Sequence, residues 1–277
     1  MNTSSPAPIP DLHALLAFYA EAGVDEALND VPINHFEKPS PPIPAKHVQP
    51  RRNMPLPPMA PQPARPTTQP VAVPDGQQVA LAQKLAANAA TLEELREHMM
   101  QFNGCNLKAT AKNLVFADGN PQAGLMIIGE APGRDEDMEG KPFVGRAGQF
   151  LDQILAAIGL DRSQVYMANV IPWRPPGNRE PTPQETEICR PFIERQIELV
   201  APKVLVHLGG VSAKTLLNTT EGILRLRGNW HVYNGLSGVD IPAMPTLHPA
   251  YLLRAPAHKR LAWRDFLEIK MKLRALS

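Results

Sequence analysis

Short apolar runs that contain no Asp, Glu, Lys or Arg recur along the chain from residue 125 onward. Runs of this length without a polar face are typical of strands that are buried on both sides of a sheet. They predict four β-strands, at residues 125–128, 165–170, 204–208 and 241–247.

Longer segments with apolar residues at helical spacing alternate with these runs. They predict helices over residues 91–102, 147–158, 183–200, 211–217 and 258–273. Capping boxes mark two of the helix starts, Thr91 with Glu94 and Thr182 with Glu185. Because strands alternate with helices, the predicted fold class is α/β, with a mainly parallel, four-stranded sheet covered on both faces.

The first 75 residues differ in composition from the rest of the chain. More than half of the 31 prolines lie there, and proline can neither donate to a hydrogen-bond ladder nor continue a helix. We therefore divide the chain into a proline-rich, largely disordered tail at residues 1–75 and a folded domain at residues 76–277. Within the tail, apolar spacing predicts an amphipathic helix near residues 10–28. It either docks onto the domain or recognises a partner protein, and the pattern leaves both roles open.

The overall composition excludes several classes of protein. No apolar run reaches the length of a membrane span and the N-terminus lacks a secretory signal, so we expect a cytoplasmic protein. Two cysteines are too few for a disulfide framework or for a metal site made only of thiolates. The net charge of +1 does not by itself indicate nucleic-acid binding.

Ligands of parallel sheets bind beyond the carboxyl ends of the strands. The residues that end or immediately follow the predicted strands are therefore candidates for a site. They are Glu130, Asn169, Gly209, Gly210 and His248. We expect these residues to converge on one edge of the sheet.

The candidate side chains suit cleavage of the bond between a sugar and a flat base. The Asn169 amide can hold a heterocycle with adjacent N–H and C=O groups, and Phe143 in "KPFVGRAG" can stack on it. Glu130 can orient water or stabilise a cationic sugar, while neutral His248 can donate a hydrogen bond to the departing base. Each residue alone would also fit a structural role, such as a core ring or a helix-dipole partner. Because they are expected at the same edge of the sheet, a functional site is favoured over separate structural roles.

Four ordered stretches, "LMIIGEAPGRDED", "GKPFVGRAGQFLD", "RPPGNREPTPQE" and "LHPAYLLR", resemble the motifs of the family 4 uracil-DNA glycosylases. The resemblance spans roughly residues 100–273. It implies a monomeric, three-layer α/β/α domain that acts on uracil-containing DNA. Such a domain flips uracil out of the duplex, hydrolyses its N-glycosidic bond and leaves an abasic site in base-excision repair.

The resemblance also implies roles for individual residues. The catalytic positions are matched by Glu130, His248 and Glu136, the last on the resemblance alone. The uracil pocket is matched by Phe143, Asn169, Ala131 and Gly133. Leu252 or Leu253 matches the wedge that fills the gap left by the flipped base. Further DNA contacts are expected from Arg254, Arg179, Gly209 and Gly210.

The sequence departs from the family pattern at its cysteines. Similar members bind a [4Fe–4S] cluster through four cysteines, whereas here Phe102 and Trp173 stand at two of those places and Cys105 and Cys189 remain. Neither aromatic ring supplies a thiolate, so we expect no cluster and no other cofactor. We expect the rings to pack against the thiols instead. Some relatives link covalently to the abasic sugar through a histidine, but "IPWRPPGNREPTP" contains none, which predicts ordinary turnover.

Two other functions and one question of specificity stay open. The chain could be a catalytically silent nucleic-acid-binding or scaffold protein, although its candidate catalytic residues are intact. It could also hydrolyse free nucleosides or nucleotides, although the basic segment "LLRAPAHKR" favours DNA. Other branches of the superfamily exclude thymine with an aromatic residue where Gly133 stands here. Glu136 or the backbone near Pro132 is the hypothesised barrier.

Overall fold

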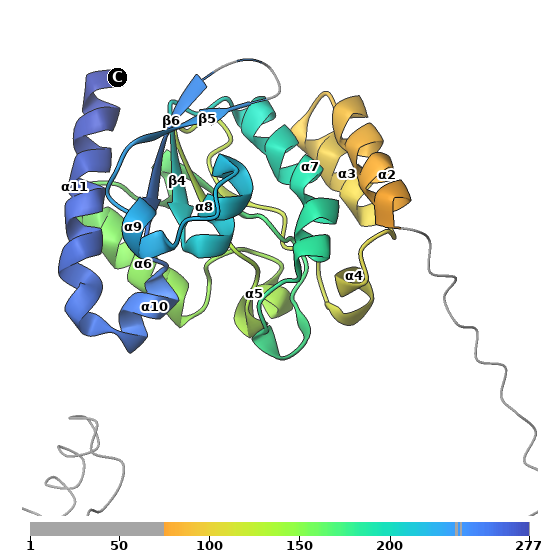
Figure 1. Ribbon diagram of the computed structural model, residues 1–277, viewed down its shortest axis with the longest axis horizontal. Coiled ribbons are helices and arrows are strands. Elements are labelled where there is room, and N and C mark those ends of the chain that lie inside the picture. Colours follow the sequence, from red (N-terminus) through yellow and green to blue (C-terminus); the bar gives the residue numbers. More distant parts are fainter. Residues whose placement is uncertain (1–74, 236–237, 239, 277) are drawn as a thin grey trace, which may run out of the picture. The chain divides into compact units, whose positions relative to one another are not determined.

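The computed structural model describes residues 75–235, 238 and 240–276. The proline-rich tail and the helix expected near residues 10–28 lie outside the described residues. A central sheet runs through the domain, with helices on both of its faces (Figure 1). The predicted α/β class and three-layer arrangement are therefore confirmed.

The sheet has six strands in the order β1-β3-β2-β4-β6-β5. Their bounds are Asp118–Gly119 for β1, Leu125–Gly129 for β2, Val165–Asn169 for β3, Val204–Leu208 for β4, His231–Asn234 for β5 and Asp240–Thr246 for β6. The four predicted strands correspond to β2, β3, β4 and β6, and they pair in parallel. The two edge strands, β1 and β5, pair antiparallel with their neighbours.

The prediction of a four-stranded sheet was therefore wrong in the number of strands. The missed strands carry no apolar run, because β1 has only two residues and β5 is largely exposed along its length. An edge strand needs only one pairing neighbour, and its pairing leaves little trace in local composition.

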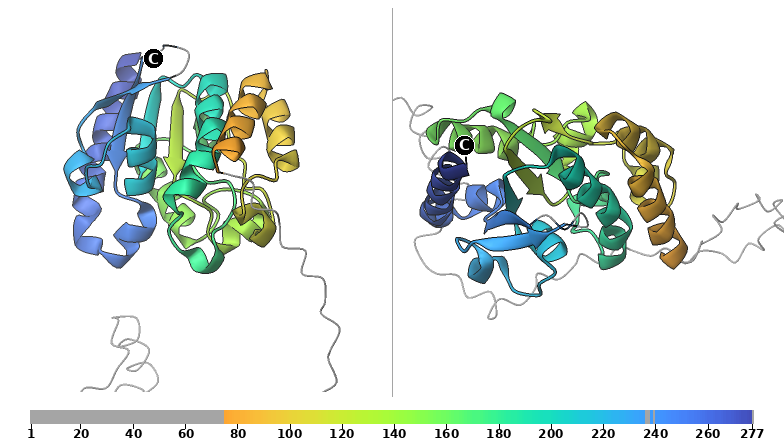
Figure 2. Two further views of the ribbon diagram at one scale, coloured as in Figure 1. Left: turned by 45° about the vertical axis from the view of Figure 1, so that its right-hand side comes forward. Right: turned by 90° about the horizontal axis from the view of Figure 1, so that it is seen from above.

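The helices form one layer on each face of the sheet, as the two further views show (Figure 2). Helices of the first half are α2 (Asp75–Asn88), α3 (Leu92–Gln101), α4 (Leu107–Thr110), α5 (Arg134–Glu139) and α6 (Arg146–Ala157). Those of the second half are α7 (Pro183–Val200), α8 (Gly210–Leu217), α9 (Ile223–Leu226), α10 (Pro249–Arg254) and α11 (Lys259–Leu276). No helix within the described residues combines the length and apolar character needed to cross a membrane.

Alternate residues of each central strand feed two separate cores. Leu125 and Ile127 pack with α6 and α11, whereas Met126 and Ile128 pack with α2, α3 and α7. This is the period of two expected of a strand buried on both faces. The long helix α7 has the predicted bounds because Thr182 and Glu185 form the capping box that the sequence indicated.

Parallel pairing brings the ends of the central strands to one edge. Gly129 is in register with Asn169, and Leu208 is in register with Thr246. The segments that leave these strands therefore start at the same level, and this positions the candidate residues next to one another.

Away from that edge, the two cysteines lie in an apolar cluster. The Cys189 and Cys105 sulfur atoms are 3.8 Å apart, and both thiols are free and buried. The Phe102 ring stacks on Trp173 with 6.4 Å between centroids and meets Phe192 edge-on. As expected, both thiols and the Phe102 and Trp173 rings belong to one buried apolar cluster.

Candidate active site

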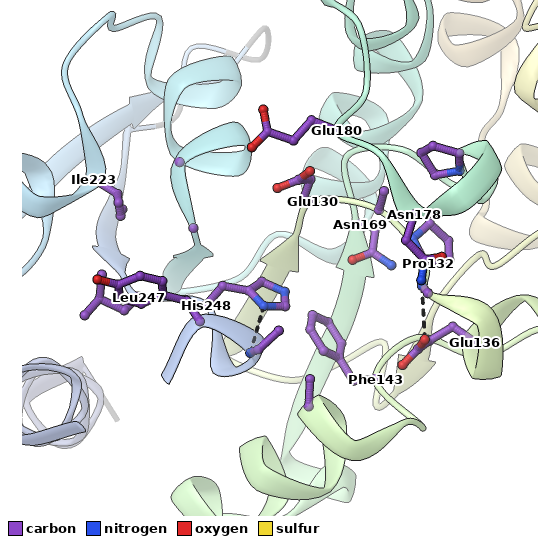
Figure 3. A pocket seen from close by; sticks show the side chains of 18 of the residues that line it. Glu130, Pro132, Glu136, Phe143, Asn169, Asn178, Glu180, Ile223, Leu247 and His248 are labelled. Atoms are coloured by element: carbon purple, nitrogen blue, oxygen red, sulfur yellow. Dashed lines mark hydrogen bonds between the residues drawn. The ribbon is translucent and has the colours of Figure 1, made fainter. Parts of the chain in front are cut away.

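A cavity of about 690 Å³ opens at the carboxyl edge of the sheet. It brings together most of the residues predicted for the site. The predicted residues that line it are Glu130, Ala131, Gly133, Glu136, Phe143, Asn169, Arg179, Gly209, Gly210, His248 and Arg254. Figure 3 shows the labelled side chains of Glu130, Asn169, Phe143 and His248 around one space.

Glu130 stands directly after β2, at the mouth of the cavity. Its backbone carbonyl accepts a hydrogen bond from the amide of Ile171, 3.0 Å away, which fixes the position of the residue. Burial raises the pKa of the Glu130 carboxyl above its usual value, and the nearby negative charge of Glu180 raises it further. The carboxylate is thus partly desolvated, as expected for one that reacts with a charged intermediate.

Asn169 and Phe143 line the cavity and approach Gly129 at the end of β2. A Cβ added at Gly129 would lie 2.4 Å from the Asn169 side-chain oxygen and 2.7 Å from the Phe143 ring. A glycine is therefore required for the amide and the ring to approach the end of β2 this closely. Both side chains are nearly buried, at 7% and 5% exposure, so their orientations are fixed before any ligand binds.

The backbone of Phe143 adopts a left-handed conformation, with φ of 56°. Such a conformation is uncommon for a bulky residue and persists only where the surroundings hold it. Here the Arg162 guanidinium donates a hydrogen bond to the Phe143 carbonyl oxygen. Arg162 is itself fixed by ion pairs with Asp118 at 2.7 Å and Asp152 at 2.8 Å. These three charged residues support the backbone of Phe143, and no local pattern in the sequence indicated their role.

Gly148 allows helix α6 to begin against this strained segment. A Cβ at Gly148 would lie 1.7 Å from the carbonyl oxygen of Phe143, which cannot move freely. We therefore expect Gly148→Ala to lower the free energy of unfolding by about 2 to 4 kcal/mol, measured by urea denaturation. The control is Gly76→Ala in α2, where an added Cβ meets nothing within 4 Å. Equal stability of the two variants would contradict this account.

His248 caps the short helix α10 and points its ring into the cavity. Its Nδ1 atom accepts a hydrogen bond from the amide of Ala250 at 3.1 Å, so the ring proton is on Nε2. Burial lowers the pKa of His248 to about 4, with a further contribution from the positive charge of Arg254. The ring is therefore neutral at physiological pH and carries a single N–H donor.

A buried ion pair fixes the strand that delivers His248. The Thr246 hydroxyl donates to Asp265 at 2.6 Å, and the Arg227 Nε atom donates to the same carboxylate at 3.0 Å. Because Thr246 is two residues before His248, this contact anchors the end of β6 to α11. Sequence patterns did not reveal it, since the partners are 19 and 38 residues apart.

Glu136 joins the two glycine-rich loops of the cavity. One carboxylate oxygen accepts a hydrogen bond from the amide of Gly133 and the other from the amide of Gly145, both at 3.0 Å. The side chain lines the cavity, but both of its oxygens bind backbone groups. This geometry favours a positioning role. Its assignment as a catalytic residue and its part in excluding thymine stay predictions.

Comparison with known proteins identifies the family. The model of the uracil DNA glycosylase superfamily matches residues 116–267 of the chain. The chain belongs to the uracil DNA glycosylase superfamily. The resemblance inferred from the four motifs is thereby confirmed.

Three relatives that carry the name Type-4 uracil-DNA glycosylase illustrate this similarity. The one from Sulfurisphaera tokodaii is 38% identical over 65% of this chain and 84% of its own length. The one from Archaeoglobus fulgidus is 38% identical over 65% of this chain and 92% of its own length. The one from Thermotoga maritima is 38% identical over 65% of this chain and 93% of its own length.

Two of the residues predicted to contact DNA already have partners within the chain, and their roles in DNA binding stay predictions. Leu252 is only 1% exposed and packs with Leu247 and Ala262, so it cannot serve as a wedge without leaving the core. Leu253, the alternative, is partly exposed. Arg179 donates two hydrogen bonds to the Glu185 carboxylate, at 2.8 and 2.6 Å, so its charge is already paired.

Several residues that line the cavity of this superfamily member were not predicted. They are Ala147, Pro175, Asn178, Glu180, Ile223, Leu224, Leu247, Ala250 and Tyr251. Asn178 and Glu180 lie within "RPPGNREPTPQE", so that motif could have indicated them. Ile223 and Leu224 lie on α9, which carries no distinctive pattern, and only the fold places them at the cavity.

Proposed function

We propose that this chain is a DNA repair glycosylase that hydrolyses the N-glycosidic bond of uracil in DNA and leaves an abasic site. The observation that carries the proposal is the meeting of Glu130, Asn169, Phe143 and His248 at one cavity. The names of the relatives at 38% identity support the same substrate. A base that is stacked and paired inside a duplex cannot reach side chains that line a cavity, so the nucleotide must be flipped out.

Recognition of the flipped base is assigned to Phe143 and Asn169. The Phe143 ring offers an apolar surface on which a pyrimidine can stack, and the Asn169 amide offers one acceptor and two donors beside it. Uracil presents adjacent N–H and C=O groups that can pair with this amide. Because both side chains are nearly buried, little entropy is lost on binding.

Bond cleavage is assigned to the Glu130 carboxylate and the neutral His248 ring. When the bond between the sugar C1′ and the base N1 breaks, its electron pair leaves with uracil and positive charge develops on the sugar. The neutral His248 ring donates its Nε2 proton in a hydrogen bond to the anionic base oxygen. The Glu130 carboxylate stabilises the cationic sugar and orients the water whose oxygen forms the new bond to C1′. The proton that this water loses passes to the Glu130 carboxylate and then to solvent, and the released uracil anion takes up a proton from solvent.

The test is a labelled DNA strand with one uracil, incubated with the protein and then treated with hot alkali. Strand cleavage at the uracil position is the expected result, since alkali breaks the chain at an abasic site. Binding without cleavage would favour the scaffold alternative. If the strand is neither bound nor cleaved, the result favours small-molecule substrates. Release of base from free deoxyuridine would then show such an activity.

We also propose that the enzyme works without an iron–sulfur cluster. A cubane cluster needs four thiolates, and among the described residues no group of three or more Cys, His, Asp or Glu side chains could hold a metal. The positions of two ligands in the family are filled by Phe102 and Trp173, whose rings pack around the remaining thiols. The residues present do not fit the cluster, so no step of the reaction is assigned to it.

This proposal predicts that the freshly purified protein contains no stoichiometric iron and lacks the broad visible absorbance of such clusters. Iron analysis and an absorbance spectrum, both on protein prepared without air, measure this directly. A [4Fe–4S] relative prepared in parallel is the positive control. About four iron atoms per chain would contradict the proposal.

A further inference from the structure

The loop between β3 and α7 carries a carboxylate that the proposed reaction does not use. Glu180 is exposed and lines the same cavity as Glu130. Figure 3 shows the two side chains directed toward the same space, and their charges interact. An acidic side chain is unexpected here, because DNA phosphates must approach the mouth of the cavity.

The neighbouring arginine does not neutralise Glu180. The Arg179 guanidinium is bound bidentately to the Glu185 carboxylate, and these hydrogen bonds lower the pKa of that carboxyl below its usual value. Arg179 contacts only the backbone carbonyl of Glu180, at 2.9 Å. Within the described part of the chain, no hydrogen bond or ion pair is formed by the Glu180 carboxylate itself.

Three local constraints hold Glu180 in this place. Pro181 restricts the residue before it to an extended backbone. Thr182 and Glu185 form the capping box that starts α7, so the chain is fixed immediately after the proline. The hydrogen bond from Arg179 to the Glu180 carbonyl fixes the other side. The backbone position of Glu180 thus follows from the ordered start of a helix, and its exposed side chain extends from that fixed point.

The other charged and titratable groups around the cavity do not offset this like-charge pair. They are Glu136, Arg179, His248, Tyr251 and Arg254. Glu136 is turned toward two backbone amides, and Arg179 is paired with Glu185. His248 is neutral, and the Tyr251 hydroxyl is hydrogen-bonded to His258 at 2.7 Å. Arg254 ends α10, and its positive charge acts on His248.

We propose that Glu180 is a positioning residue of the active site, whose negative charge acts on Glu130 and makes it a stronger base toward the attacking water. The effect of Glu180 on the reaction rests on the proposed hydrolysis of uracil, whereas its effect on the Glu130 carboxyl does not. Its physical basis is general: a nearby like charge disfavours ionisation, and a more basic carboxylate attracts a cation or a water proton more strongly. The cost is weaker attraction for the DNA backbone at this rim.

Carboxyl titration of the full chain tests the proposal without reference to activity. The side-chain carboxyl carbon of Glu130, identified by its loss from the NMR spectrum of Glu130→Gln, is followed from pH 3 to pH 8 in wild type and in Glu180→Gln. We expect the titration midpoint of Glu130 to move to lower pH in Glu180→Gln. Glu187→Gln, which removes an exposed charge on α7 away from the cavity, is expected to leave the midpoint unchanged. An unchanged midpoint in Glu180→Gln would overturn the proposal.

Kinetic measurements then test whether Glu180 affects the rate of uracil release. At saturating enzyme, the single-turnover rate of uracil release is expected to rise with pH as Glu130 ionises. In Glu180→Gln this acid limb should move to lower pH and the plateau rate should fall severalfold. A shifted titration with an unchanged plateau would remove the role in catalysis. Absence of uracil release by wild type would reject the proposed function, while the NMR titration would still decide whether Glu180 acts on Glu130.

Discussion

Glu130→Gln is expected to slow uracil release at least about 100-fold at neutral pH, measured in single turnover with enzyme in excess. Glutamine keeps the size and the planar end of the side chain but removes its negative charge. The cationic sugar and the attacking water then lose their stabilising partner at the mouth of the cavity. Because burial already disfavours the charged form of Glu130, the neutral variant is expected to be at least as stable as wild type.

A slow reaction in a variant of unchanged stability distinguishes a catalytic role of Glu130 from a structural one. Binding of uracil-containing DNA by the variant should stay close to that of wild type, since Phe143 and Asn169 are unaffected. Glu97→Gln, an exposed change on α3 outside the cavity, serves as the control for altered net charge. A wild-type rate in Glu130→Gln would remove the assigned role, and a loss of DNA binding would point to misfolding.

His248→Ala is expected to reduce the rate of base release by about 100-fold or more, because the anionic uracil loses its hydrogen-bond donor. The same substitution also removes the Nδ1 atom that accepts from the Ala250 amide. Loss of an N-cap costs about 1 kcal/mol of stability. Reduced activity of this variant alone would therefore not distinguish loss of the donor from a displaced helix α10.

His248→Asn resolves the ambiguity. Asparagine is a favoured N-cap residue and can accept the Ala250 hydrogen bond, but it is too short to place a donor where the Nε2 atom lies. We expect thermal stability close to wild type together with a rate as low as that of His248→Ala. A rate restored along with the stability would show that capping, and not hydrogen-bond donation to the base, explains the effect.

The direction of the two pKa shifts assigns the pH dependence of the reaction. His248, with a pKa lowered to about 4, is already neutral above pH 5 and keeps its Nε2 proton throughout the neutral range. Glu130, whose pKa is raised by burial and by Glu180, is the group that must lose a proton as the pH increases. The rate should therefore rise with pH through the ionisation of Glu130, and His248→Asn should retain the same midpoint.

The pattern of the sequence determined the layered fold and most of the cavity. Apolar runs, helical spacing and capping boxes depend on residues close together in the chain, so they can be recognised without coordinates. The rule that ligands bind beyond the carboxyl ends of parallel strands then located Glu130, Asn169 and His248 at one edge. Local sequence and chemistry indicated Phe143, whereas Glu136 was predicted from the four-motif resemblance alone.

Only the tertiary structure decided how these residues are held and which of them are free to act. The left-handed Phe143 backbone depends on Arg162, 19 residues away, and Leu252 is buried because it packs against residues of α6 and α11. The pairing of Arg179 with Glu185 leaves Glu180 facing Glu130, which reverses the charge expected at that rim. Local patterns specify which elements form. Contacts between distant residues, which depend on how those elements pack, decide the direction and the charge of each side chain.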